Sequence, residues 1–291
     1  MIVHVPQCRE ASAALRVSLS GLLGVWILVI PTETIRADDS RFGSATPATP
    51  TAAADESSSP RRWTLTSNVE WSHPGIGGSF TITRGSIVGT GTRISVDSLG
   101  LDEAHAFGFG LRWDWEAHGL ELRYRPFSFS GRATTSDPLI FHGVTYPAGE
   151  TIETDLRLDF LTLRYDFKLV DRDWAEFRVG PQLNYWRFSA RLHSLGPSSI
   201  DDKRTFASSM LGGFAGGEIR TSRLHLGGEA SLGWNLGDYS LIEFIAYAGM
   251  DWTDSARLDI GYRSIAFDMN ATTNDGDFFV QGPFVMFSLA F

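Results

Sequence analysis

The chain has 291 residues, enough for one large domain or two ordinary ones. Its apolar content of 43% and its charged content of 20% are those of a folded protein. A formal net charge of −9, with no block of basic residues, is a poor fit to nucleic-acid binding, and we set that class aside.

The first residues, 1–37, have the pattern of a signal peptide. Arg9 and Arg16 supply a positive start, and residues 17–30 form an uncharged apolar run. This run is shorter than the roughly 20 residues of a membrane-spanning helix, but it fits the core of a signal peptide. The single cysteine, Cys8, precedes the run, so the mature chain would contain no thiol, which suits export to an oxidising compartment. An uncleaved N-terminal anchor is the alternative.

The next two segments, 38–62 and 63–291, differ in composition. Residues 38–62 are rich in Ser, Thr, Ala and Pro and cannot bury enough apolar surface to fold, so we expect a disordered leader. From Trp63 onward, apolar and polar residues alternate with a period of two, in segments of about ten residues. This pattern is typical of β-strands that have one apolar face.

Segment 106–115 illustrates the alternation. Its apolar set is Phe107, Phe109, Leu111, Trp113 and Trp115, and its other set is Gly108, Gly110, Arg112 and Asp114. We expect about ten strands, near 63–71, 104–115, 119–130, 154–168, 175–191, 205–220, 223–236, 240–251, 256–269 and 278–291. The weakest are 205–220 and 240–251, and the loss of one hairpin would leave eight strands.

A soluble β-sandwich would also alternate, but three features favour an antiparallel up-and-down transmembrane β-barrel. The polar face carries many full charges. Short links such as 170–174 alternate with longer ones such as 133–154. Aromatic residues lie at strand ends, where a barrel places them at the membrane interfaces: Trp63, Trp71, Trp113, Trp115, Tyr124, Trp186, Trp234 and Trp252.

The alternation changes phase at two points, Phe160–Leu161 and Tyr185–Trp186. A β-bulge would produce this change, and so would a strand that continues beyond the membrane. We favour the second explanation because the strand near 154–168 exceeds the roughly 9–11 residues that a spanning strand needs. The side chains of Asp155, Arg157 and Asp159 would then project into solvent.

The last strand carries a resemblance to a known family. Val285, Phe287, Leu289 and Phe291 repeat every second residue up to the chain end, and this pattern is similar to the C-terminal signature that the barrel-assembly machinery reads. The stretch 258–268, LDIGYRSIAFD, resembles the penultimate strand of OmpA-like and OmpW-like porin-family barrels. Residues 63–291 thus resemble a small Gram-negative outer-membrane β-barrel. The resemblance implies an outer-membrane location and assigns no subfamily.

The same closing strand predicts its own pairing. Phe279, Pro283 and Phe287 should face lipid, and the strand should pair with the first one near Trp63, because hydrocarbon does not tolerate an open sheet edge. Gly282 and Pro283 interrupt the ladder, so a bulge or weakened seam is expected there.

Charged residues on the inward faces form the candidate site. The predicted network is Arg112, Asp114, Glu121, Arg123, Arg164, Asp166, Glu176, Arg178, Glu229, Arg257 and Asp259. Basic and acidic residues nearly balance, so the favoured interpretation is a salt-bridged plug that closes the lumen. A narrow polar conduit for small solutes or hydrophobic ligands is the alternative.

A catalytic site is a third possibility, because outer-membrane lipid- or protein-modifying enzymes place His with Ser, Asp or Glu near the outer rim. His142 and the pair His193–Ser194 are the candidates, and neither lies in a recognised motif. We expect no enzyme activity, no metal and no cofactor. The expected partners are outer-membrane lipid, lipopolysaccharide and the barrel-assembly machinery, and a monomer is favoured.

Overall fold

The computed structural model describes residues 63–84, 90–235, 238–271 and 274–291. The predicted signal peptide and leader, residues 1–62, lie outside this part of the chain. Within it, no helix is long and apolar enough to cross a membrane.

Most of the described chain is strand, as the alternation predicted. In chain order the elements are β1 (Trp63–Ser72), β2 (Gly75–Ile82), β3 (Ile94–Ser95), the 3₁₀ helix η1 (Val96–Leu99), β4 (Ala106–Trp115), β5 (His118–Thr134), β6 (Leu139–Phe141), β7 (Val144–Tyr146), β8 (Thr151–Arg172), β9 (Ala175–Ser194), β10 (Asp201–Arg220), β11 (Leu224–Trp234), β12 (Tyr239–Asp251), β13 (Ala256–Ala271) and β14 (Asn274–Ala290).

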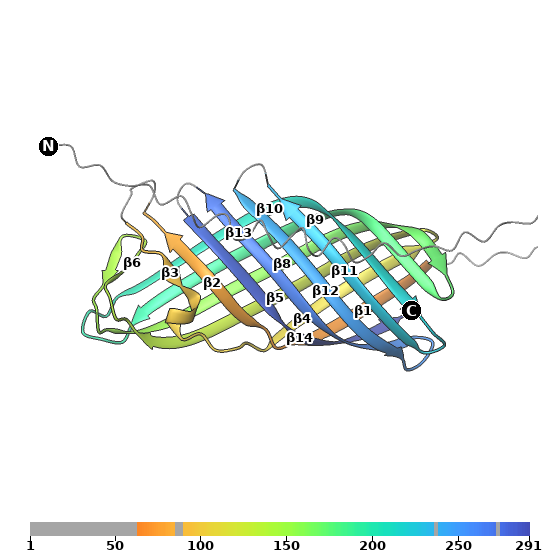
Figure 1. Ribbon diagram of the computed structural model, residues 1–291, viewed down its shortest axis with the longest axis horizontal. Helices are drawn as coiled ribbons and strands as arrows, with labels where there is room; N and C mark the ends of the chain where they lie inside the picture. The colour runs from red at the N-terminus through yellow and green to blue at the C-terminus, as the bar shows by residue number, and fades with distance from the viewer. Residues whose placement is uncertain (1–62, 85–89, 236–237, 272–273) are drawn as a thin grey trace, which may run out of the picture. The chain divides into compact units, whose positions relative to one another are not determined.

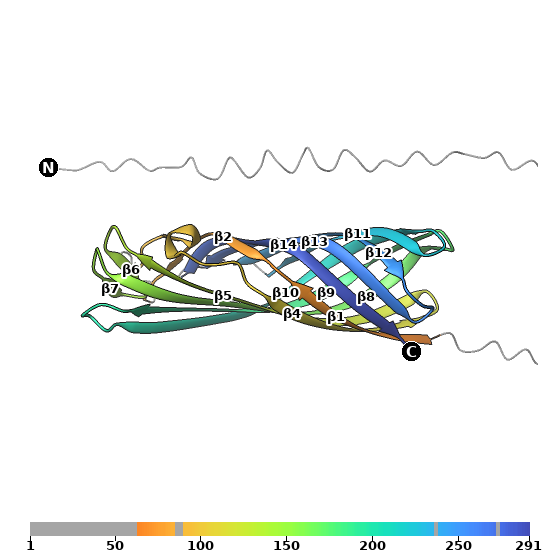
Figure 2. The ribbon, with the colours of Figure 1, turned by 90° about the horizontal axis from the view of Figure 1, so that it is seen from below.

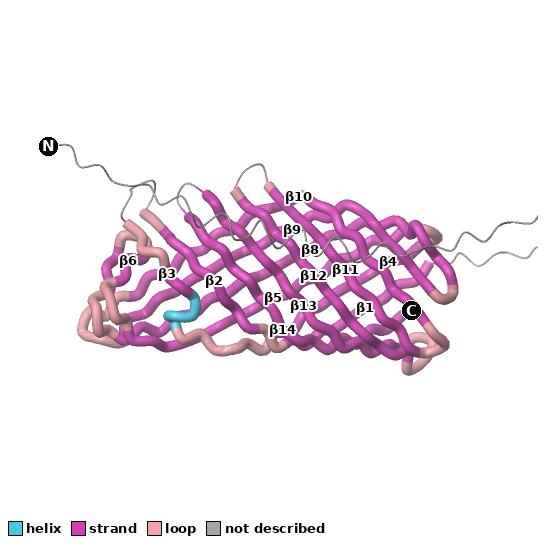
Figure 3. Tube along the Cα trace, in the orientation of Figure 1, coloured by secondary structure: helices cyan, strands magenta, loops and turns pink. Residues whose placement is uncertain are grey.

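The main sheet closes on itself (Figures 1 and 3). Its order is β1-β4-β5-β8-β9-β10-β11-β12-β13-β14-β2-β3, and β1 also pairs with β14. β2 follows β1 after His73 and Pro74, and both pair with β14, so the two act as one interrupted strand. Across the described residues the result is a closed antiparallel barrel of ten strands. The predicted fold class is confirmed, and the eight-strand alternative is wrong.

The two ends of the barrel differ. Four connections at one end are tight turns, at 116–117, 173–174, 221–223 and 252–255, and the chain end Phe291 pairs with Leu65 there. We call this the short-turn end. The opposite end, the loop end, holds the longer connections and the separate hairpin β6–β7, which Figure 2 shows far from the C-terminus.

The closing strand pairs as predicted, with Thr66 opposite Ala290 and Ser72 opposite Phe284. Phe279, Pro283 and Phe287 face outward. The predicted bulge at Gly282–Pro283 is wrong, because the register continues unchanged from Ser72–Phe284 to Gly75–Gln281. The N–H of His73 donates to the carbonyl of Pro283 at 3.1 Å across this point. Pro74 and Pro283 reduce the number of hydrogen bonds between the strands because each lacks an N–H, but they do not change the pairing register.

The phase change at Phe160–Leu161 is not a bulge either. β8 and β9 stay in one register from Ile152–Ser194 to Arg164–Gln182. Even-numbered residues of β8 point inward from Ile152 to Asp166, so Phe160 is buried, while Asp155 and Arg157 are exposed on the outer wall. Asp159 was also expected to project into solvent, but it is only 9% exposed and accepts hydrogen bonds from Arg157 and Tyr124. The strand therefore continues beyond the apolar belt, as we favoured. Trp186 follows the same rule and is 1% exposed, so its predicted place in an interfacial girdle is wrong.

The barrel thus has opposite polarity in its two halves. At the short-turn half, the outer wall is apolar and the lumen is charged. At the loop half, the outer wall is charged and the lumen is filled by buried apolar side chains, which we call the apolar tier. It includes Phe80, Val96, Leu99, Phe127, Phe129, Phe141, Tyr146, Leu156, Phe160, Trp186, Phe188, Phe267 and Phe278. The sequence pattern did not predict β2, β3, η1, β6 or β7, and each of these elements contributes buried side chains that complete the tier.

Candidate functional site

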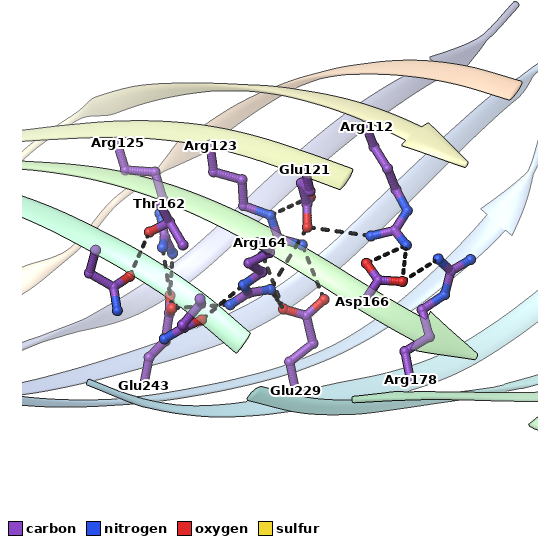
Figure 4. A network of polar contacts seen from close by, with 12 residues as sticks. Arg112, Glu121, Arg123, Arg125, Thr162, Arg164, Asp166, Arg178, Glu229 and Glu243 are labelled. Atoms are coloured by element: carbon purple, nitrogen blue, oxygen red, sulfur yellow. Dashed lines mark hydrogen bonds and ion pairs between the residues drawn. The ribbon is translucent and has the colours of Figure 1, made fainter. Parts of the chain in front are cut away.

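The charged lumen of the short-turn half is the candidate site, and we call its side chains the charged tier. The structure places every predicted network residue on an inward face of β4, β5, β8, β9, β11 or β13. The alternation explains this placement, because a strand whose odd positions contact lipid must turn its even positions into the lumen. Figure 4 shows part of this network, in which side chains such as Arg123 and Glu229 meet from strands far apart in sequence.

One cluster lies toward the short-turn end. The Arg112 guanidinium lies 2.8 Å from Asp166 and 2.9 Å from Asp114. Arg178 lies 2.6 Å from Asp114 and 3.0 Å from Asp166, so the two arginines share the same two carboxylates. Arg178 also pairs with Glu176 on its own strand. This arrangement ties β4, β8 and β9 together.

A second cluster crosses the middle of the lumen. Arg123 donates to both carboxylate oxygens of Glu229, at 3.0 and 3.1 Å, although β5 and β11 lie on separate parts of the wall. Arg164 donates to the same carboxylate at 2.6 Å. Glu121 lies 2.5 Å from Arg123 and 3.5 Å from Arg112, which joins this cluster to the first.

A third cluster involves β10 and β13. Arg257 lies 3.0 Å from Asp259 and 2.5 Å from Glu218. His225 contacts the same Asp259 at 2.5 Å, and both side chains are almost fully buried. Each carboxylate therefore has a cationic or imidazole partner, which offsets the cost of removing it from water.

A further layer of ion pairs lies next to the apolar tier, and of its four residues the sequence pattern of inward faces missed only Glu243. Arg125 forms a bidentate pair with Glu243, and Arg263 forms one with Glu70, with 2.7 Å between Nη2 and Oε2 in the second pair. The Nε atom of Arg263 is also 3.2 Å from Glu243. Glu70, Arg125 and Arg263 alternate clearly in sequence. Glu243 does not, because it lies between apolar Leu241 and Ile245 on the inward face of β12, and only that face assignment could have identified it.

On the loop-end side of this layer, the lumen becomes apolar within one or two residue pairs. Trp186 packs on Phe267 at a ring-centroid distance of 4.4 Å, and Phe188 packs on Phe278 at 5.1 Å. Phe80 of β2 packs on both rings of the second pair, with centroid distances of 5.9 Å to Phe188 and 5.7 Å to Phe278. Tyr146 of the hairpin is fully buried and donates its hydroxyl to the carbonyl of Leu192 at 2.9 Å.

Two internal cavities interrupt the charged tier. The larger, of 300 Å³, is lined by charged side chains of both signs, among them Arg112, Arg178, Glu176 and Glu218, and by neutral residues such as Thr66 and Ser288; it reaches the turn at Thr253–Ser255. The smaller, of 20 Å³, lies among Glu70, Arg125, Arg263 and Phe284, next to the apolar tier. About one water molecule fits a space of that size. The available space therefore narrows from the short-turn end toward the middle.

The predicted catalytic candidates do not form a catalytic group. His193 and Ser194 are neighbours on β9 and point to opposite sides of the wall; Ser194 is buried and bonds to Glu150 and Ser198. His142 lies in the β6–β7 turn with Nδ1 3.6 Å from Asp202. Burial and the nearby Arg204 lower the pKa of His142, while Asp202 acts in the opposite direction. No group of three or more His, Cys, Asp or Glu in the described chain is placed to hold a metal ion.

Comparison with known proteins gives a likeness of fold. No protein-family model and no curated protein matches the sequence. Among solved structures, the outer membrane protease OmpT of Escherichia coli matches with a TM-score of 0.51 at 10% identity, over 78% of this chain and 97% of that one. Ail of Yersinia pestis, in complex with the heparin analogue sucrose octasulfate, matches with a TM-score of 0.38 at 8% identity, over 77% and 99%. OprG of Pseudomonas aeruginosa matches with 0.29 at 12% identity, over 79% and 95%.

The closed barrel and the OmpT likeness together define the class. The chain has the fold of an outer-membrane β-barrel, as the terminal strand and the alternation predicted. At these identities the likeness extends to the fold and not to the protease activity of OmpT.

Proposed function

We propose that the chain is an integral outer-membrane barrel whose lumen is closed to solutes, and that it serves a structural or surface-interaction role. One observation carries this proposal: Arg123 and Arg164 reach across the lumen to the same carboxylate, Glu229, directly below the layer of Arg125, Glu243 and Arg263. A solute would have to break buried ion pairs and then enter the apolar tier.

The direction of insertion follows from the connections. Transmembrane barrels place short turns in the periplasm and longer loops outside. The short-turn end is therefore periplasmic in this proposal, and the apolar tier with β6 and β7 lies at the cell surface. The proposed partners are the barrel-assembly machinery, through Val285, Phe287, Leu289 and Phe291, and lipopolysaccharide around the outer wall. We propose a monomer with no enzyme activity.

Planar-bilayer recording tests the closed lumen. The purified full chain should insert without stable single-channel steps over a wide voltage range. Heat-modifiable migration on unboiled gels, measured on the same preparation, establishes that the barrel is folded. Stable steps from a heat-modifiable preparation would reject the closed lumen.

The alternative is a narrow conduit, and the 300 Å³ cavity is the observation that favours it. A conduit would need that cavity to continue through the apolar tier, where Trp186 and Phe188 are 1% and 0% exposed. Liposome swelling with small sugars and amino acids separates the two functions. A lipid-modifying enzyme is tested by lipid A analysis after overexpression, and altered acylation would reject the non-enzymatic proposal.

A further inference from the structure

The outer wall of β8, β9 and β10 carries cations in three rows just beyond the apolar belt. The rows follow the strand register: Asp159, Arg187 and Ala207 in the first, Arg157, Ser189 and Thr205 in the second, and Asp155, Arg191 and Lys203 in the third. Tyr185 and Leu161, 42% and 37% exposed, form the row immediately below and belong to the apolar belt. The cations therefore begin where the lipid-facing surface ends.

Arg187 is one of two cations in this patch that have no partner among the described residues. The carboxylate directly opposite, Asp159, already accepts from Arg157 at 3.0 Å and from the Tyr124 hydroxyl at 3.1 Å. The exposed Arg187 guanidinium makes no hydrogen bond or ion pair with any residue in the described ranges. Its neighbours on β10, Thr205 and Ala207, are short, so the guanidinium is accessible from the side of the barrel.

The third row adds a like-charged pair. Lys203 and Arg191 lie directly opposite each other on β10 and β9, an arrangement that is unfavourable without an intervening anion. Arg191 is paired with Asp201 at 2.7 Å, while the ammonium of Lys203 has no ion-pair partner among the described side chains. The three rows hold four cations and two carboxylates, and the next row adds Glu153 and Asp201, so the positive charge that has no partner is that of Arg187 and Lys203.

The opposite wall has the reverse charge. Asp268, Asp275 and Asp277 project from β13 and β14, and among the described residues Arg93 is the cation that forms ion pairs with them, 3.6 Å from Asp275. The net charge of this group is −2. At this height the β13–β14 wall therefore carries an excess of carboxylates, whereas the β8–β10 wall carries the unpartnered cations Arg187 and Lys203.

We propose that Arg187, together with Arg157, Arg191 and Lys203, binds the phosphate groups of a phosphorylated glycolipid in the outer leaflet. This inference rests on the proposed outer-membrane location. The guanidinium geometry suits bidentate contact with phosphate. A glycolipid fits because its acyl chains would continue along the apolar belt below Tyr185, while its phosphates would lie at the level of Arg187.

The test measures binding of diphosphoryl lipid A to the detergent-solubilised full chain by native mass spectrometry. Arg187→Gln should weaken binding roughly tenfold, equivalent to ~1.4 kcal/mol. Lys203→Gln should weaken it in the same direction. The matched control is Arg223→Gln, which removes an exposed arginine from the short turn 221–223 at the other end of the barrel, and it should leave binding unchanged. The loss of affinity caused by Arg187→Gln should be smaller for monophosphoryl lipid A than for the diphosphoryl form.

Several results would overturn the inference. Equal weakening by Arg187→Gln and Arg223→Gln would indicate non-specific charge attraction. No weakening by either Arg187→Gln or Lys203→Gln would reject the site. Displacement of lipid A by excess inorganic phosphate would show a general anion site in place of a glycolipid site. Heat-modifiable migration and insertion into vesicles are measured separately, so a failure of the proposed outer-membrane function is distinguished from a failure of this site.

Discussion

Arg164 lies at the centre of the lumen with 1% of its side chain exposed, 2.6 Å from Glu229 and within 4 Å of Glu121 and Glu243. Its guanidinium carbon also lies 4.6 Å from the ring centroid of Phe214. A buried charge pair adds little net stability compared with apolar side chains of similar volume, but removing one partner leaves the other charge uncompensated. Arg164 is therefore the residue at which a single change should unbalance the charged tier most.

We predict that Arg164→Ala lowers the free energy of unfolding by about 3–5 kcal/mol. Urea unfolding and refolding in lipid vesicles, followed by tryptophan fluorescence, measures the change. Arg223→Ala at the turn 221–223 is the control and should change stability by less than about 0.5 kcal/mol. The double variant Arg164→Met with Glu229→Gln should recover part of the loss, because it removes both charges. Equal stability of Arg164→Ala and the control would show that the network is not energetically coupled.

Glu150 holds the 195–200 loop at the other end. Its Oε1 atom accepts from the hydroxyls of Ser194 and Ser198, and from the Ser198 N–H at 3.3 Å. These hydrogen bonds lower the pKa of Glu150 below its ordinary value of 4.5, and the hydroxyls of Ser194 and Ser198 contribute most. A carboxyl with a lowered pKa stabilises the fold above its ordinary pKa, and this contribution is lost as pH falls through the lowered value.

We therefore predict that the loop loosens only in acid. The amide resonance of Ser198 should stay constant from neutral pH down to 4.5 and shift below it, because protonation weakens the acceptor. In Glu150→Gln this step should be missing, and the loop should be more susceptible to protease at neutral pH. A step that persists unchanged in Glu150→Gln would assign the transition to another group.

At the scale of the strand, the outward row of β8 defines the membrane-contacting surface. Leu163 is 41% exposed on that row, between Leu161 and Tyr165, and pairs with Leu183 on β9. We predict that Leu163→Arg costs about 2–4 kcal/mol of folding free energy in vesicles, the range for an arginine at the bilayer midplane. Ser128→Arg, on the outward face of β5 toward the loop end, is the matched control, and it should cost less than about 1 kcal/mol because that part of the wall lies outside hydrocarbon. Equal costs at the two positions would contradict the assigned belt.

The sequence predicted the strands well because the membrane imposes a strict period of two. Each strand had to turn one face to lipid, and this requirement made even the glycine-rich β10 recognisable. The elements that lie inside the lumen, such as β6 and β7, do not contact lipid, so no period of two marks them in the sequence. β6 and β7 lie in a stretch with Ser, Asp, Pro and Gly that reads as a loop, and only the packing of Phe141 and Tyr146 into the lumen reveals their role. Likewise, nothing in local sequence shows that Glu243 meets Arg125, because β5 and β12 are brought together only when the barrel closes.

The phase change at Phe160 shows a limit of the same kind. The pattern told us that polarity reverses, and the favoured interpretation placed Asp155 and Arg157 outside the membrane. It could not show that the inward faces above this point are filled by apolar side chains from η1, β2 and the β6–β7 hairpin, because those contacts depend on how the loops fold back. The composition of the apolar tier is therefore a tertiary property, whereas the alternation assigned most residues of the charged tier to inward faces and left Glu243 and the choice of ion-pair partners undetermined.

At the scale of the whole barrel, the proposed closed lumen would consist of two chemically different barriers placed in series. The charged tier would resist the passage of a solute because its ion pairs would have to separate. The cavity near Arg125 and Arg263 has a volume of only 20 Å³. The apolar tier would resist passage because buried apolar side chains pack around Trp186 and Phe188. Two barriers in series predict that opening either one leaves the barrel closed, so each tier can be tested in the background of the other.

We predict that Trp186→Ala with Phe188→Ala gives no single-channel steps, and that Arg123→Ala with Glu229→Ala also gives none. The variant that combines all four changes should conduct, because the enlarged spaces would then connect along the axis. Each aromatic truncation should cost about 3–5 kcal/mol of stability, so heat-modifiable migration must be measured for every variant before recording. Conductance from one tier variant alone would identify that tier as the only barrier. A silent four-residue variant that migrates as a folded barrel would instead locate the closure elsewhere, with the η1 segment and the β6–β7 hairpin as the next elements to remove.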